Sequence, residues 1–364
     1  MISSHSIESY DISVLSMPLR EPFRMVTNTI VTVDAVVLRL YLKSGLVGNA
    51  YLFSYDRRLT RILAELCDWL VEAIQQSDIS DPEACWRLLN RSITLVGPEG
   101  LAMMAVAAVD VAIWDLKAKS LGVPLWRLLD RPGEGTAVYG SGGGLGSSID
   151  ALLREATDFV AMGCGGYKMK VGQPRLREDV ERVRSVREAI GPGVALIADA
   201  NQGWDYETAI RFADEIADLD LLWLEEPLAV RDKEANRLLR SRLSMPLAGG
   251  ENEFGSYTFQ GLVESDSLDI IMPNLQRSGG ITGWLEIAEI AARSDCAVSM
   301  HLFCEIAAQL MDGLPNGGWV EYLPWWDRMM VTPHAFDGGK IRPPATAGVG
   351  LEFDESAVKR YSAI

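Results

Sequence analysis

The spacing of apolar residues changes once along the chain, at about residue 136. Residues 7–55 alternate apolar and polar positions and contain a turn near Ser44–Gly45, so they predict antiparallel strands. Residues 57–130 predict helices, including a long Ala-rich helix that is buried on most faces and ends at Gly122. The first third of the chain therefore predicts an α+β unit.

From there to the last strand, short apolar strands alternate with charged amphipathic helices. The predicted strands are, in order, TAVYGS, YKMKV, ALIADAN, LLWLEEP, MPLAGGEN, LDIIMPN, AVSMHLF and WVEYLP. Eight such units of roughly 25 residues are typical of a (β/α)₈ barrel. A doubly wound sheet would have fewer repeats and a Gly-rich nucleotide turn, and GSGGGLG lacks the setting of a dinucleotide site. We therefore predict an α/β fold with a TIM-like barrel.

Charge and composition exclude some classes of partner. The net charge of −16 and pI of about 4.7 argue against binding to nucleic acid or to anionic membranes. The N-terminus lacks the apolar core of a signal peptide, and the longest apolar run, Leu101 to Val109, is broken by Asp110. The five cysteines are scattered and no pair has metal-ligand spacing, so we expect reduced thiols in a cytoplasmic protein.

Polar residues end nearly every predicted barrel strand, where barrel enzymes carry their working groups. In strand order they are Lys168 and Lys170, Asp199 and Asn201, Glu225 and Glu226, Glu251 and Asn252, Asn274, His301, and Glu321. Asp199, Glu225 and Glu251 follow one another at intervals of 26 residues, which places three carboxylates side by side at one mouth. Each acid alone would suit a surface salt bridge or a helix cap. Three in register, with oxygen ligands only, favour Mg²⁺ or Mn²⁺.

Lys168 and Lys170 lie one residue apart on a strand, so both side chains point to the same face. Alone, such a pair would suit a solvated strand edge. Beside a metal and apolar walls, we expect a lowered lysine pKa, with Lys170 as a neutral base and Lys168 as its electrostatic neighbour. His301 shares this mouth and is expected to be functional, whereas His5 and His334 have no such setting.

Several motifs resemble the enolase superfamily, specifically the mandelate racemase-like subgroup of the mandelate racemase/muconate lactonizing enzyme family. The resemblance covers nearly the whole chain. The motifs that carry it are MPLREPF, GNAYLFSY, AVDVAIWDLKAK, PLWRLL, the Lys-x-Lys strand, DANQ, WLEEP, GGEN, GGITGW, HLFCEIAA and WVEYL. It implies an N-terminal α+β capping domain over residues 1–130, a barrel over 131–335, and a segment over 336–364 that returns to the capping domain.

The resemblance also implies roles for individual residues. Asp199, Glu225 and Glu251 would hold Mg²⁺. Lys170 would be the base on one face of a small carboxylate substrate, and His301 the acid/base on the other. Glu321 would hydrogen-bond a carboxylate oxygen of the enediolate intermediate. The assisting and substrate-binding positions would be Lys168, Asn201, Ser141 and Tyr51, with the loop of residues 20–31 closing over the substrate. A homo-oligomer, such as an octamer, is also implied.

Two departures from the family pattern bear on the reaction. Asn274 stands where the racemase and related acid-sugar dehydratases have an aspartate that pairs with the histidine, and a neutral amide should leave His301 mostly uncharged. Arg24, Thr27 and Asn28 make the capping loop more polar than a mandelate site, which suggests a polar substrate for which Arg24 would contact a second anionic group. Arg24 would equally suit a plain surface position.

These features predict abstraction of the α-proton of a hydroxy-carboxylate. We expect acid-sugar dehydration, because an elimination with Lys170 as base demands least of His301. Racemisation or epimerisation of an α-hydroxy acid is the alternative. A catalytically silent protein is a third reading, against which the complete carboxylate triad argues.

Overall fold

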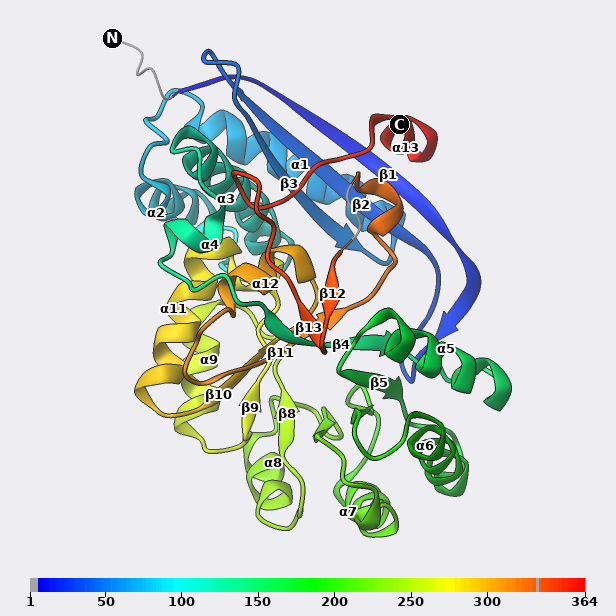
Figure 1. Ribbon diagram of the computed structural model, residues 1–364. Helices are drawn as coiled ribbons and strands as arrows, with labels where there is room; N and C mark the ends of the chain where they lie inside the picture. The colour runs from blue at the N-terminus through cyan, green and yellow to red at the C-terminus, as the bar shows by residue number, and fades with distance from the viewer. Residues whose placement is uncertain (1–5, 332–333, 364) are drawn as a thin grey trace.

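The computed structural model describes residues 6–331 and 334–363 (Figure 1). An antiparallel sheet opens the chain, with β1 (Ile7–Arg24), β2 (Thr29–Leu42) and β3 (Val47–Ser54) paired in sequence order. The central strand β2 is almost wholly buried from Val33 onward because it is paired on both edges and covered by helices.

Four helices follow the sheet: α1 (Arg57–Ile74), α2 (Pro82–Ile93), α3 (Gly100–Ser120) and α4 (Leu125–Leu128). Asp56 and Asp81 cap the first two by accepting hydrogen bonds from backbone N–H groups. Helix α3 is apolar on nearly all faces because it packs against the sheet, α1, α2 and two barrel helices. The predicted α+β unit is confirmed.

Eight parallel strands form the barrel, and the pairing of the first with the last closes it. They are β4 (Thr136–Gly142), β5 (Gly166–Lys170), β6 (Ala195–Asp199), β7 (Trp223–Glu225), β8 (Leu247–Gly249), β9 (Ile270–Ile271), β10 (Ala297–Met300) and β11 (Gly317–Tyr322). Large side chains such as Tyr139, Trp223 and Met272 fill the interior, so the barrel is a packed core. The predicted barrel is confirmed.

Helices connect the barrel strands and surround them (Figure 1). They are α5 (Ile149–Met162), α6 (Leu176–Ile190), α7 (Tyr206–Glu215), α8 (Lys233–Arg240), α9 (Gly255–Glu264), α10 (Leu275–Ser278), α11 (Gly280–Arg293) and α12 (Cys304–Leu310), with 3₁₀ turns η1 (Ala217–Leu219) and η2 (Asp327–Met329). In the part of the chain that the structure describes, no helix has the length and apolar character that crossing a membrane requires.

Buried polar contacts join the α+β unit to the barrel. Asp110 on α3 accepts hydrogen bonds from Thr282 N at 3.0 Å and Thr282 Oγ1 at 2.6 Å, at the first turn of α11. Trp114 donates to the same hydroxyl at 2.9 Å. Burial raises the pKa of Asp110 to about 7. This network fixes the orientation of α3, and of the sheet packed on it, over the barrel mouth.

The C-terminal segment runs from the barrel back to the antiparallel sheet (Figure 1). Strands β12 (Phe336–Asp337) and β13 (Lys340–Ile341) pair with each other, and β13 also pairs with β4. The last helix, α13 (Glu355–Tyr361), lies against β1. Arg39 on β2 forms an ion pair with Glu355 at 2.7 Å. The end of the chain therefore ties the two units together.

Candidate active site

A cavity of about 490 Å³ lies between the C-terminal ends of the barrel strands and the first two strands of the chain. The N-terminal unit contributes Phe23, Met25, Thr27, Asn28, Phe53 and Tyr55 to its wall. The barrel contributes Ser141, Lys170, Asn201, Gln202, Glu251, Asn252, Arg277, His301, Leu302, Glu321, Leu323 and Trp325. Most of the polar strand-end residues that the sequence predicted therefore meet in one enclosed space.

The segment of residues 20–31, which the family resemblance implied would be a loop over the substrate, consists of the ends of β1 and β2 and the turn between them. Arg24 pairs with Thr29, and the turn closes through a hydrogen bond from Met25 N to Asn28 O at 2.8 Å. Side chains alternate along a strand, so Phe23 and Met25 face the cavity while Arg24 between them is exposed and does not line it. The predicted substrate contact from Arg24 is therefore absent from this conformation.

Asp199, Glu225 and Glu251 stand at the ends of three adjacent strands. One carboxylate oxygen from each lies within 4.8 Å of the other two. Asp199 and Glu225 are buried, and the Glu251 side chain is only 12% exposed. Glu251 Oε2 has no well-aligned hydrogen bond from any described residue and has only His301 Nε2 nearby, at 3.1 Å, so it can still coordinate a cation. The oxygen-only donor set suits Mg²⁺.

The two lysines of β5 point into this carboxylate cluster. Lys168 Nζ lies 2.7 Å from Glu225 Oε1 and 2.8 Å from Glu321 Oε1, and Lys170 Nζ lies 2.5 Å from Asp199 Oδ2. Both side chains are buried. The Lys-x-Lys strand is thus part of the barrel interior and not a solvated edge.

The protein groups alone raise the pKa of Lys170, whereas the sequence-based expectation of a lowered pKa assumed a bound divalent cation as well. Burial lowers this pKa, but the charges of Asp199, Glu251 and Glu225 together outweigh burial. The pKa of Lys168 is likewise raised, because Glu225 and Glu321 outweigh its burial. The sequence argument counted the lysines as cations near a metal. It did not count the carboxylates as their direct partners.

A charge count favours one divalent ion at the three-carboxylate cluster. Four carboxylates, those of Asp199, Glu225, Glu251 and Glu321, surround two ammonium groups. If all six groups are ionised, two negative charges are left without a partner. Burial raises the pKa of Glu225 well above its usual range despite the contact with Lys168, as expected for an acid whose neighbours supply too little positive charge.

His301 faces the cavity from β10 and is oriented by Asn274. The Asn274 side-chain oxygen accepts hydrogen bonds from Gln276 N at 3.1 Å and from Arg277 N, so it caps α10. Its amide nitrogen therefore faces His301 Nδ1, at 2.7 Å. Because an amide nitrogen can only donate, Nδ1 is an acceptor, and the proton of the neutral ring is on Nε2.

The Nε2 atom of His301 lies 3.1 Å from Glu251 Oε2 and 3.7 Å from Glu321 Oε2. Burial lowers the pKa of His301 more than these two acids raise it, and Lys168 and Arg277 lower it further. A neutral ring is what the replacement of the family's aspartate by Asn274 predicted. The tautomer goes beyond that prediction, because an Nε2–H group donates and cannot accept a proton from substrate.

The remaining predicted site residues divide into two groups. Ser141 and Asn201 line the cavity, and Asn201 N donates to Asp199 Oδ1 at 2.8 Å, which orients that carboxylate. Tyr51 does not line this cavity. It lies in a separate small cavity with Glu305, so the structure does not bring it to the predicted substrate position.

Sequence reasoning missed two polar residues of the wall, Gln202 and Arg277, and gave Asn252 a strand-end position but no role. Gln202 immediately follows the predicted site residue Asn201, so its place near a strand end could have indicated it. Arg277 follows the capping residue of α10 and contacts Glu251 O at 2.6 Å as well as the Asn252 side chain. Only the three-dimensional path of this turn shows that Arg277 reaches the cavity.

Two family models cover most of the chain. Residues 151–357 match the enolase C-terminal domain-like family, and residues 9–130 match the N-terminal domain of mandelate racemase/muconate lactonizing enzyme. The chain belongs to the mandelate racemase/muconate lactonizing enzyme family of the enolase superfamily. Membership makes it an enolase-superfamily enzyme with Mg²⁺ as its cofactor, which the sequence predicted.

Three relatives illustrate the range of this family around the chain. L-talarate/galactarate dehydratase of Salmonella typhimurium is 30% identical over 96% of this chain and 90% of its own. L-talarate dehydratase from Polaromonas sp., complexed with Mg and L-glucarate, has a TM-score of 0.92 and 30% identity, covering 99% of this chain and 98% of its own. A racemase from Streptomyces coelicolor with bound magnesium has a TM-score of 0.93 and 28% identity, covering 98% of this chain and 100% of its own.

Proposed function

We propose that this protein is a Mg²⁺-dependent dehydratase of sugar-derived hydroxy acids. The observation that carries the proposal is the contact of Asn274 Nδ2 with His301 Nδ1 at 2.7 Å. It makes His301 a hydrogen-bond donor toward the cavity and leaves Lys170 as the base. The relatives named as acid-sugar dehydratases support the same reaction class.

The residues of the mouth divide the work of a β-elimination. Asp199, Glu225 and Glu251 would hold the ion, which when bound supplies positive charge beside the substrate carboxylate. Lys170 takes the α-proton from one side. His301 donates a hydrogen bond from Nε2–H to the β-hydroxyl, which departs as hydroxide and takes its proton from solvent, because full transfer of the Nε2 proton would leave an imidazolate. Glu321 lies between Lys168 and His301, and Lys168 holds it in place. Burial raises the pKa of Glu321, but Lys168 and His301 together lower it to about 2, so Glu321 would have to gain a proton before it could donate a hydrogen bond to the substrate carboxylate.

The cavity wall suits a polyhydroxylated acid. Thr27 and Asn28 of the hairpin and Gln202, Asn252 and Arg277 of the barrel offer amide, hydroxyl and guanidinium groups to successive hydroxyls. Phe23 and Trp325, whose rings pack edge to face at 5.1 Å, supply an apolar part of the wall. The polar groups favour a sugar acid over an aromatic hydroxy acid such as mandelate.

Racemisation or epimerisation of an α-hydroxy acid is the second candidate. The observation in its favour is that Lys170 and His301 both line the one cavity from separate strands, as two-base chemistry requires. It would need His301 Nε2 to accept a proton, and thus a tautomer change that breaks the contact with Asn274.

A screen of mono- and diacid sugars in deuterated water, with Mg²⁺, tests the proposal. Dehydration gives a 2-keto acid that a carbonyl reagent detects, with loss of water. Deuterium incorporation without keto acid would instead show racemisation or epimerisation. A substrate set that includes mandelate distinguishes the polar from the aromatic preference.

Two further parts of the proposal concern the state of the protein. Homo-oligomerisation, as an octamer or a smaller assembly, follows from the family resemblance, and sedimentation velocity would measure it. A cytoplasmic location fits the cysteines, all five of which are free among the described residues.

A further inference from the structure

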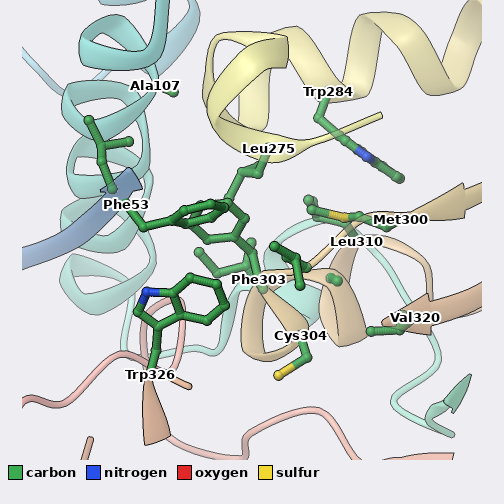
Figure 2. Close-up of a cluster of buried hydrophobic side chains, with 14 of the residues drawn as sticks. Phe53, Ala107, Leu275, Trp284, Met300, Phe303, Cys304, Leu310, Val320 and Trp326 are labelled. Carbon is green, nitrogen blue, oxygen red and sulfur yellow. The ribbon is translucent and has the colours of Figure 1, made fainter. Parts of the chain in front are cut away.

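A second cluster of metal-ligating side chains lies beside the active-site cavity, on the far side of Glu321. Cys304 and Glu305 begin α12, and His334 comes from the segment after η2. Together with Asp327 they line an enclosed space of about 10 Å³, which has room for one ion or one water molecule. Figure 2 shows Cys304 at the edge of the apolar cluster, with its sulfur pointing away from the other labelled side chains.

The distances between these groups match the edges of a tetrahedral metal site. Cys304 Sγ lies 3.3 Å from His334 Nε2 and 3.5 Å from a Glu305 carboxylate oxygen. A tetrahedral Zn²⁺ with ordinary bond lengths would separate sulfur from nitrogen or oxygen by about 3.5–3.6 Å. One ligand atom from each of Cys304, Glu305 and His334 lies within 4.8 Å of the others. The cluster therefore needs only small adjustments to surround an ion.

Glu305 is a buried carboxylate of the same cluster. It is 8% exposed and its Oε2 atom contacts Cys304 Sγ, while its Oε1 atom lacks a well-aligned hydrogen bond among the described residues although the Tyr51 hydroxyl lies near this carboxylate. A buried, unpaired carboxylate oxygen costs free energy unless something satisfies it. A cation in the cluster would satisfy this oxygen and would also stabilise the thiolate of Cys304.

We propose that Cys304, Glu305 and His334 bind a divalent transition-metal ion of the Zn²⁺ class. Thiolate and imidazole ligands select such ions and disfavour Mg²⁺, so the site differs in chemistry from the three-carboxylate site. Asp327 is placed for the fourth position, since its Oδ1 lies 3.5 Å from the same His334 Nε2, while Tyr322 donates to its other oxygen at 2.5 Å.

The ion would fix the turn that immediately follows His301 in the chain. Leu302 and Phe303, between His301 and the cluster, have φ angles of 58° and 52°, a left-handed conformation that costs free energy for such side chains. Binding at Cys304 and His334 would hold this turn against the segment after β11. An ion can enter through the larger groove, of about 530 Å³, that Glu305 and His334 also line.

Cobalt titration of the full-length protein tests the proposal. The Glu225→Gln background weakens the three-carboxylate site, and Co²⁺ bound to a thiolate gives a near-ultraviolet charge-transfer band that carboxylate sites do not give. We expect one equivalent of Co²⁺ with this band, displaced by Zn²⁺ and unaffected by excess Mg²⁺. Cys304→Ser should remove the band, and His334→Gln should weaken Co²⁺ binding at least tenfold.

Cys296→Ser is the matched control, because Cys296 is a partly buried thiol outside the cluster. It should keep the full band. The proposal is overturned if the parent protein shows no thiolate band, if the band survives in Cys304→Ser, or if it disappears in Cys296→Ser. Melting temperatures measured without metal show whether each variant is folded, and a folded Cys304→Ser that binds Zn²⁺ as tightly as the parent would also overturn it. These outcomes do not depend on which substrate the enzyme uses.

Discussion

The two sides of the active-site cavity carry their proton-transfer groups in different surroundings. On one side, Lys170 Nζ lies 2.5 Å from a predicted metal ligand, Asp199, and charged groups surround it. On the other, His301 is held by the neutral amide of Asn274. The protonation of the lysine therefore depends on the charge at the metal site, whereas the tautomer of the histidine depends on one fixed hydrogen bond.

This difference shows how one residue can change the reaction that a shared scaffold favours. Asn274 caps α10 through its oxygen and orients His301 through its nitrogen. Because the cap fixes the oxygen toward backbone N–H groups, the amide cannot rotate to accept a proton from the ring without losing the cap. His301 therefore stays a hydrogen-bond donor toward the cavity. Only Lys170, on the other face, is left to accept the α-proton.

The largest effect is expected from removing the base. Lys170→Ala should lower the rate of α-proton exchange with deuterated solvent by about 10²–10⁴-fold, since that is what a positioned base contributes. Mass spectrometry of recovered substrate measures the exchange. Lys340→Ala, at an exposed lysine of β13, is the control. Unchanged exchange in the Lys170 variant would make the lysine pair structural.

The next effect concerns the metal site. Glu225→Gln should lose Mg²⁺ affinity and turnover together, because one of three clustered carboxylates is neutralised. Glu226→Gln is a matched control: Glu226 is buried next to it but accepts hydrogen bonds from Gly250 N and Gln202. Calorimetric titration with Mg²⁺ compares the two variants. Full activity of the parent protein in excess chelator would contradict the predicted metal dependence.

A gain of function is expected on the histidine side. Asn274→Asp would place a carboxylate against His301 Nδ1, move the ring proton there and leave Nε2 free to accept one. Deuterium exchange from the His301 face of an α-hydroxy acid should rise about tenfold for each 1.4 kcal/mol by which the imidazolium is stabilised. Asn274→Ala separates this gain from simple loss of the amide. No gain, together with efficient racemisation by the parent, would reverse our order of the two functions.

Much of the fold could be predicted from the sequence because barrel strands and helices have regular periods. The eight strands fall where apolar runs occur, and the carboxyl ends of parallel strands meet at one mouth. That rule alone brings Asp199, Glu225 and Glu251 together. Residues at strand ends were predictable since their position depends on register and not on the path of a loop.

Residues on turns could not be predicted in the same way. Arg277 reaches the cavity because the short helix α10 turns back over Glu251, and no periodicity encodes that path. Cys304 and His334 lie 3.3 Å apart in space but 30 residues apart in sequence. The direct contact between Lys170 and Asp199 could not be predicted either, because counting charges does not show which carboxylate pairs with which lysine. The lowered pKa expected for Lys170 beside a bound cation stays a prediction.

The smallest effect is expected from removing the positive charge of Arg277, which acts on the pKa of His301. Arg277 is among the groups that lower the pKa of His301. The neutral ring is the active form, so activity is lost as pH falls through this pKa, which lies below the ordinary value of 6.5. Arg277→Gln removes a positive charge, so the pKa of His301 should rise and the acid limb of kcat/KM should move to higher pH by about a few tenths of a unit.

Arg231→Gln, at a largely exposed arginine paired with Glu253, is the control and should leave the acid limb in place. Asn274→Asp should move it further in the same direction, because its carboxylate would contact the ring directly. A limb that moves to lower pH in Arg277→Gln would mean that a group other than His301 sets the acid side of the profile.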